Sequence, residues 1–214
     1  MRLVACGHDV VQSPLLEPVA LAWRLPDEPV DAVIFTSPQG PVFAGRKATT
    51  CRRLPAYAVG ARTAAAARDR GFADVRTVGG DVAALLDAVA ADGHRRALHL
   101  AGAHRTAATV PAGLQLIVRA VYEARLVRLC FEAQSALRSG RIDWTLLFSA
   151  RSAAHFALLF DALGADRSTL SIAAISPAVL AAAGDGWRRA VVAPTPDEAG
   201  ILAASGLSCD KSPA

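Results

Sequence analysis

Two stretches of the chain share one pattern of apolar and polar positions. Residues 31–40 (DAVIFTSPQG) and 143–152 (DWTLLFSARS) each begin with Asp, continue through apolar residues or Thr, and break at Ser. This pattern predicts a buried parallel strand followed by a turn into a helix. Residues 56–79 and 172–194 also match each other, since both predict a strand, a small-residue turn, an Ala-rich helix and a second strand.

The spacing of the two matches indicates an internal duplication. Asp143 follows Asp31 by 143 − 31 = 112 positions, and Ser176 follows Gly60 by 176 − 60 = 116 positions. A drift this small is typical of a duplicated α/β unit with changes in loop length.

Alternation of short apolar runs with Ala-rich amphipathic segments predicts parallel sheets covered by helices, with right-handed connections. The segment after Ser37 and Pro38 is interrupted by Gly and Pro, so we expect its crossover helix to be weak or partly lost. Asp81 is the expected N-cap of the helix at 81–92. The predicted strands are 31–36, 56–59, 75–78, 97–100, 144–148, 170–175 and 189–193, and the predicted helices are 1–7, 63–70, 81–92, 130–139, 152–163, 177–183 and 197–204.

Two further extended stretches predict a linker. Residues 114–129 alternate apolar and polar side chains without a turn signal, and we expect them to pair with the proline-rich stretch near 10–19. The predicted fold is therefore two flavodoxin-like parallel-sheet domains, related by duplication and joined by a two-stranded β-ladder. The predicted limits are 1–9 plus 130–208 for an outer domain, 10–24 and 114–129 for the linker strands, 25–113 for an inserted domain, and 209–214 for a tail.

The two predicted domains differ by one strand. The inserted domain ends with the strand at 97–100, and nothing after the last helix of the outer domain corresponds to it. We therefore expect the matching strand of the outer domain to precede residue 1.

Composition agrees with a folded protein that binds an anionic small molecule. The 214 residues are 53% hydrophobic and 20% charged, which is enough to bury a core, and no apolar run approaches the roughly 20 residues of a membrane span. Of the 23 basic residues all but Lys47 and Lys211 are Arg, and the net charge is +4. Arg binds carboxylates bidentately. The basic residues form separated pairs without an aromatic stripe, which does not favour a nucleic-acid partner.

Neither the cysteines nor the histidines predict a metal or disulfide site. The four Cys residues are far apart and lack paired spacing, so we expect reduced thiols. His8, His94, His99 and His155 have no metal-ligand spacing and are expected to be structural. The N-terminal residues lack the features of a secretory signal, so the expected location is the cytoplasm.

Seven motifs, taken in order and spacing, resemble the uroporphyrinogen-III synthase family over essentially the whole chain. They are FTSP at 35–38, AVGARTAAAARDRGF at 58–72, LHLAGAHR at 98–105, VYEA at 121–124, LLFSARSAAHF at 146–156, AAISPAVLAAAG at 173–184 and APTPDEAGILAA at 193–204. The short, Ala- and Arg-rich form resembles the alphaproteobacterial branch.

The resemblance implies a cofactor-free, monomeric lyase whose active site lies in a cleft between the two domains. Its substrate would be hydroxymethylbilane, a linear tetrapyrrole with eight carboxylates. Loss of the hydroxyl group as water gives an azafulvene, ring D attacks to form a spiro intermediate, and ring closure with ring D inverted gives uroporphyrinogen III.

The resemblance also implies site residues. Tyr122 matches the Tyr of the family's linker strand and is the expected hydrogen-bond donor to the leaving hydroxyl. The expected substrate-binding residues follow the strands at their turns: Thr36, Ser37, Gly60, Thr63, His104, Arg105, Ser149, Arg151, Ser176 and Ala178. Ala178 and Val179 stand where the family often has hydroxyl residues, so backbone N–H groups would act there.

Other interpretations remain open at this point. The turn hydroxyls could serve only as helix caps, and Tyr122 could simply be packed on its strand. The chain could be a noncatalytic two-domain anion-binding protein or an inactive truncated homologue. A flavodoxin-like nucleotide binder is a further alternative, although the chain lacks a G-x-G-x-x-G loop.

Overall fold

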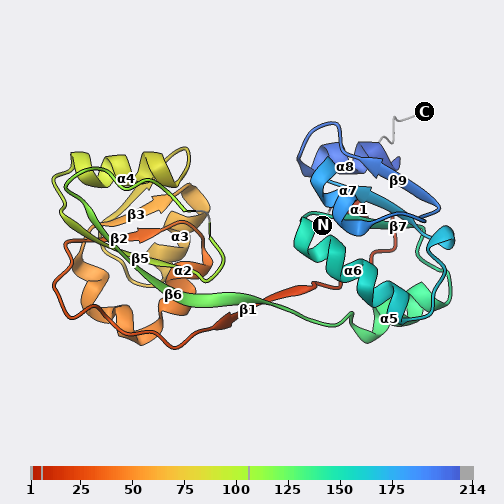
Figure 1. The fold of residues 1–214 in the computed structure, drawn as a ribbon, viewed down its shortest axis with the longest axis horizontal. Helices are drawn as coiled ribbons and strands as arrows, with labels where there is room; N and C mark the ends of the chain where they lie inside the picture. Colours follow the sequence, from red (N-terminus) through yellow and green to blue (C-terminus); the bar gives the residue numbers. More distant parts are fainter. Residues whose placement is uncertain (1, 6, 106, 208–214) are drawn as a thin grey trace. The chain divides into compact units, whose positions relative to one another are not determined.

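The computed structural model describes the chain except for residues 1, 6, 106 and 208–214. The chain divides into two compact units (Figure 1): unit 1 comprises Met1–Glu17 and Leu126–Ala214, and unit 2 comprises Pro18–Arg125. This division allots residues 10–24 and 114–129 to the units themselves, so the separate linker domain stays a prediction. The expected tail at 209–214 lies outside the described residues.

Unit 2 is built on a parallel sheet with the strand order β6-β5-β2-β3-β4. Its elements are β2 (Ala32–Phe35), α2 (Gln39–Ala44), the 3-10 helix η1 (Gly45–Arg53), β3 (Ala56–Val59), α3 (Ala61–Asp69), β4 (Val75–Val78), α4 (Val82–Ala91), β5 (Arg96–Gly102) and β6 (Gln115–Leu126). The predicted strands at 56–59 and 75–78 are confirmed to the residue. Asp81 caps α4 as predicted, because its carboxylate accepts the backbone N–H groups of Ala83 and Ala84.

The side chains of β2 alternate between two cores, as expected for a strand covered on both faces. Val33 and Phe35 pack with residues of α2, η1 and α3, whereas Ala32 and Ile34 pack with Leu85, Leu86 and Val89 of α4. All four residues of β2 are fully buried. β2 is therefore the central strand of this unit.

The expectation of a weak or partly lost crossover helix after β2 is confirmed in part, because only six residues of the segment are α-helical. The segment forms the six-residue α2 and then the nine-residue η1, and both bury small side chains against the sheet. Pro41 is tolerated because it lies in the first turn of α2, where backbone N–H groups have no partner within the helix.

The short strand β1 (Leu16–Ala20) borders β6 at the edge of the sheet. Leu21 N–H donates to Val121 O (2.9 Å), and Val127 N–H donates to Leu15 O (3.0 Å). The partner number falls as the residue number rises, so the two segments run antiparallel. The chain thus passes between the units twice, once along each segment.

Unit 1 contains a smaller parallel sheet with the order β7-β8-β9. Phe156, Phe160 and Trp187 dominate the core on one face, whereas Ile201 and Leu202 lie in the core on the other. In the described part of the chain, no helix is both long and apolar enough to cross a membrane. The elements are α1 (Arg2–Ala5), α5 (Phe131–Arg138), β7 (Trp144–Leu147), α6 (Ala150–Ala162), the 3-10 helix η2 (Arg167–Thr169), β8 (Ser171–Ala174), α7 (Pro177–Ala183), β9 (Arg189–Val192) and α8 (Glu198–Ser205).

The two sheets pair their strands in the same register. Val33 lies opposite Ala56 in unit 2, and Thr145 lies opposite Ile172 in unit 1. Thr145 follows Val33 by 145 − 33 = 112 positions, and Ile172 follows Ala56 by 172 − 56 = 116 positions. These are the same two offsets that separate the repeated segments in the sequence. The sheets differ on the other side of the first strand, because β2 also pairs with β5, whereas β7 pairs only with β8 among the described residues.

Asp31 holds β5 at its start. Its carboxylate accepts the backbone N–H groups of Arg95 (2.8 Å) and Arg96 (3.2 Å). We predict that Asp31→Ala lowers the free energy of unfolding by about 1–2 kcal/mol, because two donors lose a charged acceptor. Urea denaturation measures this loss.

The repeat supplies the matched control for this measurement. Asp143, at the equivalent position, has an 85% exposed side chain, and among the described residues its carboxylate accepts no backbone N–H. Asp143→Ala should therefore change the stability by less than about 0.5 kcal/mol. Equal losses in the two variants would contradict the assigned role of Asp31.

Candidate functional site

The strands β2, β3 and β5 end on the same side of the unit 2 sheet, and most of the predicted residues of this unit follow them there. We call this side, where the parallel strands end, the carboxyl edge of the sheet. Thr36 and Ser37 follow β2, Gly60 follows β3, and His104 and Arg105 follow β5 within three residues of its end at Gly102. Because these strands are parallel neighbours, their ends lie side by side. This edge is the usual position of ligand sites in open α/β sheets.

Tyr122 of β6 belongs to the same edge. It pairs with Gly102, the last residue of β5, at a register shift between Ala101 and Gly102. A Cβ atom on Gly102 would lie 2.9 Å from a ring carbon of Tyr122, so only glycine leaves room for the ring. The ring also stacks on Phe43 of α2, with 5.7 Å between centroids. Tyr122 is half-buried, and among the described residues its hydroxyl has no hydrogen-bond partner.

Thr36 is joined to a buried histidine. Its Oγ1 lies 3.0 Å from Nε2 of His99, whose side chain is only 4% exposed. Burial, together with the nearby Arg105 cation, lowers the pKa of His99 to about 4. The ring is therefore neutral at pH 7, and which of the two atoms donates depends on its tautomer. This contact fixes the Thr36 side chain at the edge.

The turn residues differ in how free they are to bind a ligand. The Ser37 hydroxyl accepts the backbone N–H of Gln39, the first residue of α2 (3.2 Å), so it already makes one hydrogen bond within the turn. Gly60 has a φ of 78° and precedes α3 without any side-chain cap, which leaves the first N–H groups of that helix available. Thr63 is 3% exposed and lies in the core, so it is the least accessible predicted residue. His104 and Arg105 are exposed.

Unit 1 presents an equivalent edge at the ends of β7 and β8. Ser149 caps α6 by accepting the N–H of Ser152 (3.1 Å), and the two hydroxyls are 2.7 Å apart. Ser176 stands at the N-cap of α7 but makes no capping bond through its side chain. Arg151 and Ala178 are exposed in the first turns of these helices. Of the two serines, Ser176 therefore has the hydroxyl not used as a cap.

Three residues that arrange the carboxyl edge of unit 2 were not predicted from the sequence. His99 was expected to be structural, and its contact with Thr36 depends on the pairing of β2 with β5. Gly102 and Phe43 position the Tyr122 ring from two other elements. The Gly at the end of LHLAG was the available signal for Gly102, whereas nothing in the sequence placed Phe43 beside Tyr122.

Comparison with known proteins identifies relatives of this arrangement. Residues 2–203 match the family model described as uroporphyrinogen-III synthase HemD. The crystal structure of uroporphyrinogen-III synthetase from Helicobacter pylori 26695 superposes with a TM-score of 0.62 at 18% identity, covering 89% of each chain.

A second solved structure is less similar. A mutant uroporphyrinogen III synthase from the extremely thermophilic bacterium Thermus thermophilus gives a TM-score of 0.41 at 12% identity, covering 90% of this chain and 85% of that one. No curated protein sequence matches the chain. The Helicobacter structure, with its TM-score of 0.62, supports the mixed α/β fold with parallel sheets.

The buried His99 predicts a pH dependence of stability. The unfolded chain binds a proton at this histidine below a pH of about 6.5, whereas the folded chain does so only near pH 4. Stability should therefore fall as the pH drops from about 6.5 to about 4, on the order of 2–3 kcal/mol from this group. His99→Gln should reduce the change in the free energy of unfolding between pH 6.5 and 4, as measured by urea denaturation at each pH, although it lowers stability at pH 7.

His104→Gln is the control for this titration, because His104 is exposed. In this variant the free energy of unfolding should depend on pH between 6.5 and 4 as it does in the unaltered chain. An unaltered slope in His99→Gln would show that other groups cause the acid dependence.

The close approach at Gly102 predicts that Gly102→Ala displaces the Tyr122 ring. The added Cβ would overlap a ring that Phe43 holds from another side, so we expect a loss of about 1–3 kcal/mol. NMR spectra should show shifted ring resonances of Tyr122. Gly79→Ala is the control, because a Cβ there meets nothing within 4 Å and the backbone is unstrained. If Gly102→Ala left the Tyr122 resonances unmoved, the contact would not position the ring.

Proposed function

Because this chain belongs to the uroporphyrinogen-III synthase HemD family, it is an enzyme of heme biosynthesis, and we propose that it acts as a lyase on hydroxymethylbilane. The family match over residues 2–203 is the observation that carries this conclusion. The reaction converts the linear tetrapyrrole to uroporphyrinogen III, with loss of water and inversion of ring D. The alternative of a noncatalytic anion-binding protein is not favoured.

The first chemical step is the loss of the hydroxyl group from the hydroxymethyl carbon. The C–O bond breaks, the departing oxygen takes up a proton to leave as water, and the pyrrole becomes a cationic azafulvene. A hydrogen-bond donor on the departing oxygen accelerates such a step. In the described part of unit 2, Tyr122 is a half-buried hydroxyl without a protein partner, so it is available for this role.

The position of Tyr122 supports this role. Its ring is held between Gly102 and Phe43, which limits the directions that its hydroxyl can take. An ordered donor acts without a cost of reorganisation when the bond breaks. In the next steps ring D attacks to form the spiro centre, a carbon–carbon bond of that centre breaks, and the ring recloses at the free α-carbon of ring D. That carbon then releases a proton, which balances the proton taken up by the departing oxygen. These exchanges of carbon–carbon bonds need a held substrate.

The substrate carboxylates require cations and N–H donors. Arg105 is an exposed cation beside the end of β5, and the uncapped N–H groups after Gly60 are suited to an anion. In unit 1 the corresponding groups are Arg151, the hydroxyls of Ser149 and Ser176, and the N–H of Ala178. We propose that each unit binds part of the substrate through the carboxyl edge of its own sheet.

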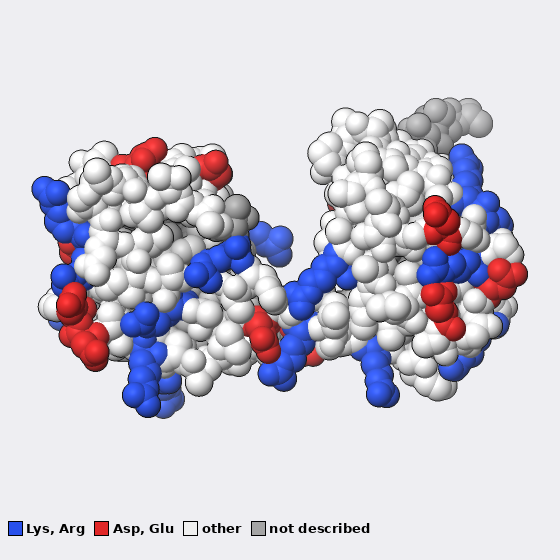
Figure 2. Space-filling view, in the orientation of Figure 1, with Lys and Arg blue, Asp and Glu red and all other residues white. Residues whose placement is uncertain are grey.

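The surface charge agrees with a small anionic ligand. On the face drawn in Figure 2, basic side chains occur in separate groups among acidic and uncharged residues. We further propose that the enzyme is cofactor-free, monomeric and cytoplasmic, and that its two flavodoxin-like domains arose by duplication. The shared registers of β2/β3 and β7/β8 support the duplication.

We predict that Tyr122→Phe lowers kcat by about 10- to 100-fold with little change in KM, because the donor acts mainly in the transition state. The assay incubates the protein with freshly prepared hydroxymethylbilane, oxidises the products to porphyrins and separates the type I and type III isomers. Phe43→Leu is the control, because it removes the stacked ring but keeps the hydroxyl, and its effect should be smaller.

Two results would overturn these assignments separately. An unchanged kcat in Tyr122→Phe would remove the proposed role of Tyr122 but leave the activity intact. Formation of only the type I isomer, the spontaneous product, by the unaltered chain would contradict the activity itself.

A further inference from the structure

Unit 2 has a pocket away from the carboxyl edge of its sheet. It has a volume of about 600 Å³ and is formed by the segment after β1, by η1 and by β6. Arg119 of β6 pairs with Leu100, two residues before β5 ends at Gly102. The pocket therefore lies beside the middle of β6, not where the strands end. Its lining residues are Ala22, Trp23, Arg24, Lys47, Val118, Arg119 and Ala120.

The positive charge of this pocket is uncompensated. Arg24, Lys47 and Arg119 are cations, and no Asp or Glu belongs to the described lining. Within the part of the chain that the structure describes, none of the three forms an ion pair. Elsewhere in unit 2, by contrast, Arg96 pairs with Glu28 at 2.9 Å. Three like charges thus share one small surface, and they repel one another unless an anion binds between them.

Backbone carbonyl groups hold two of these cations in place. Lys47 Nζ donates to Trp23 O (2.7 Å), and Arg119 Nε donates to Arg24 O (3.0 Å). Arg119 Nη1 also donates to Val118 O (3.2 Å). A carbonyl group orders a cation without neutralising its charge, so both side chains stay available to an anion.

The segments that carry these groups are anchored in the core. Trp23 is 6% exposed and packs in the same cluster as Val33 and Phe35 of β2. Ala48, which follows Lys47 in η1, is 1% exposed and belongs to that cluster as well. The cations are thus arranged before any ligand arrives, which lowers the entropic cost of binding.

Several donors of the pocket remain unused. A Lys ammonium group has three N–H donors, and an Arg guanidinium group has five. Protein acceptors take one donor of Lys47 and two of Arg119, and among the described residues the Arg24 guanidinium has no hydrogen-bond partner. Donors from three side chains are therefore free to meet one ligand.

We propose that this pocket binds a small anion of the phosphate class, inorganic phosphate or pyrophosphate, through Arg24, Lys47 and Arg119. A dianion offsets more of the local charge than one carboxylate does. Its oxygens also point in several directions, so each can accept from a different side chain. These residues differ from those proposed for the substrate, so the site does not depend on the proposed reaction.

The walls of the pocket indicate that its ligand has no ring system. Between the cations the lining consists of Ala22, Val118 and Ala120, and the Trp23 side chain is buried in the core. No aromatic face of the described lining is therefore open to a base, although stacking supplies much of the affinity for single-stranded nucleic acids. The pocket thus fits free phosphate better than a nucleotide or a nucleic acid.

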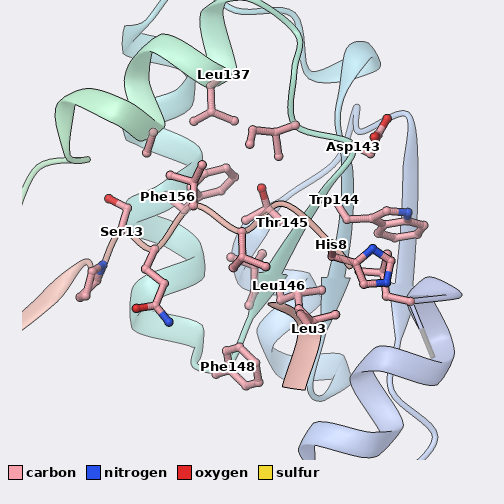
Figure 3. A pocket seen from close by; sticks show the side chains of 18 of the residues that line it. Leu3, His8, Ser13, Leu137, Asp143, Trp144, Thr145, Leu146, Phe148 and Phe156 are labelled. Carbon is pink, nitrogen blue, oxygen red and sulfur yellow. The ribbon is translucent and has the colours of Figure 1, made fainter. Parts of the chain in front are cut away.

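A cavity in unit 1 shows the contrast. It has a volume of about 850 Å³, and its walls are mainly apolar (Figure 3). Asp9, Asp143 and Glu198 lie in its lining, together with the cation Arg141. Because the acidic groups repel a phosphate, we expect no phosphate binding in this cavity.

An NMR titration of the 214-residue chain tests the proposal. Phosphate is added at about pH 8 while chloride keeps the ionic strength constant, because salt screens exposed charges. The amide resonances of Trp23, Arg119 and Ala120 should shift and saturate, with a dissociation constant on the order of 1 mM. Pyrophosphate, which carries more charge, should bind at least about threefold more tightly, whereas acetate should bind at least about tenfold more weakly.

Neutral variants identify the cations that bind the anion. Arg24→Gln and Lys47→Gln should each weaken phosphate binding about three- to tenfold, because each removes one charged donor from an exposed position. Arg46→Gln is the matched control, since Arg46 is an exposed cation next to Lys47 that does not line the pocket. Its dissociation constant should stay within about 1.5-fold of that of the unaltered chain.

Any of four outcomes would overturn the proposal. Absence of a saturable shift would show that the pocket binds no such anion. Equal weakening in Arg46→Gln and Lys47→Gln would show that phosphate responds only to the overall positive charge. Shifts at Gly60 and Arg105 without shifts at Arg119 would place the anion at the carboxyl edge instead. Equal binding of acetate and phosphate would show that the pocket does not require an anion of the phosphate class.

Discussion

The parallel pairing of β5 with β2 is the constraint on which the candidate site of unit 2 depends. It places His99 within hydrogen-bonding distance of Thr36, and it carries Arg105 to the edge where β2 and β3 end. The same strand pairs on its other side with β6 and sets Gly102 beneath Tyr122. One strand therefore determines three features of the edge, and Asp31 fixes where it begins.

The sequence predicted the strands and most helices because their signals are local. Short apolar runs, the Asp81 cap and the Pro at the start of α7 are readable without tertiary contacts. The crossover after β2 was predicted to be weak because of its Gly and Pro, and its α-helix is indeed short, but burial against the sheet stabilises both α2 and the 3-10 helix η1 that follows it. Local propensity is a weak prior where a segment covers a core.

The candidate site was predictable only in part. The turn residues follow strands that must share an edge, so their grouping within each unit could be anticipated from the pattern. The support of Tyr122 by Phe43 and of Thr36 by His99 depends on strand register and on contacts between distant segments. The burial of Thr63 likewise depends on which face α3 turns to the sheet. No periodicity in a single sequence contains this information.

The insertion of unit 2 within unit 1 has a consequence for synthesis. Unit 2 is continuous in sequence, so it can fold as soon as residue 125 has left the ribosome. Residues 1–17 belong to a unit whose sheet includes β9, which ends only at Val192. At about 5–20 residues per second, the N-terminal segment therefore waits roughly 10–35 seconds for its partners. During that interval its apolar residues are available to chaperones, and a ribosome paused after unit 2 would prolong their exposure.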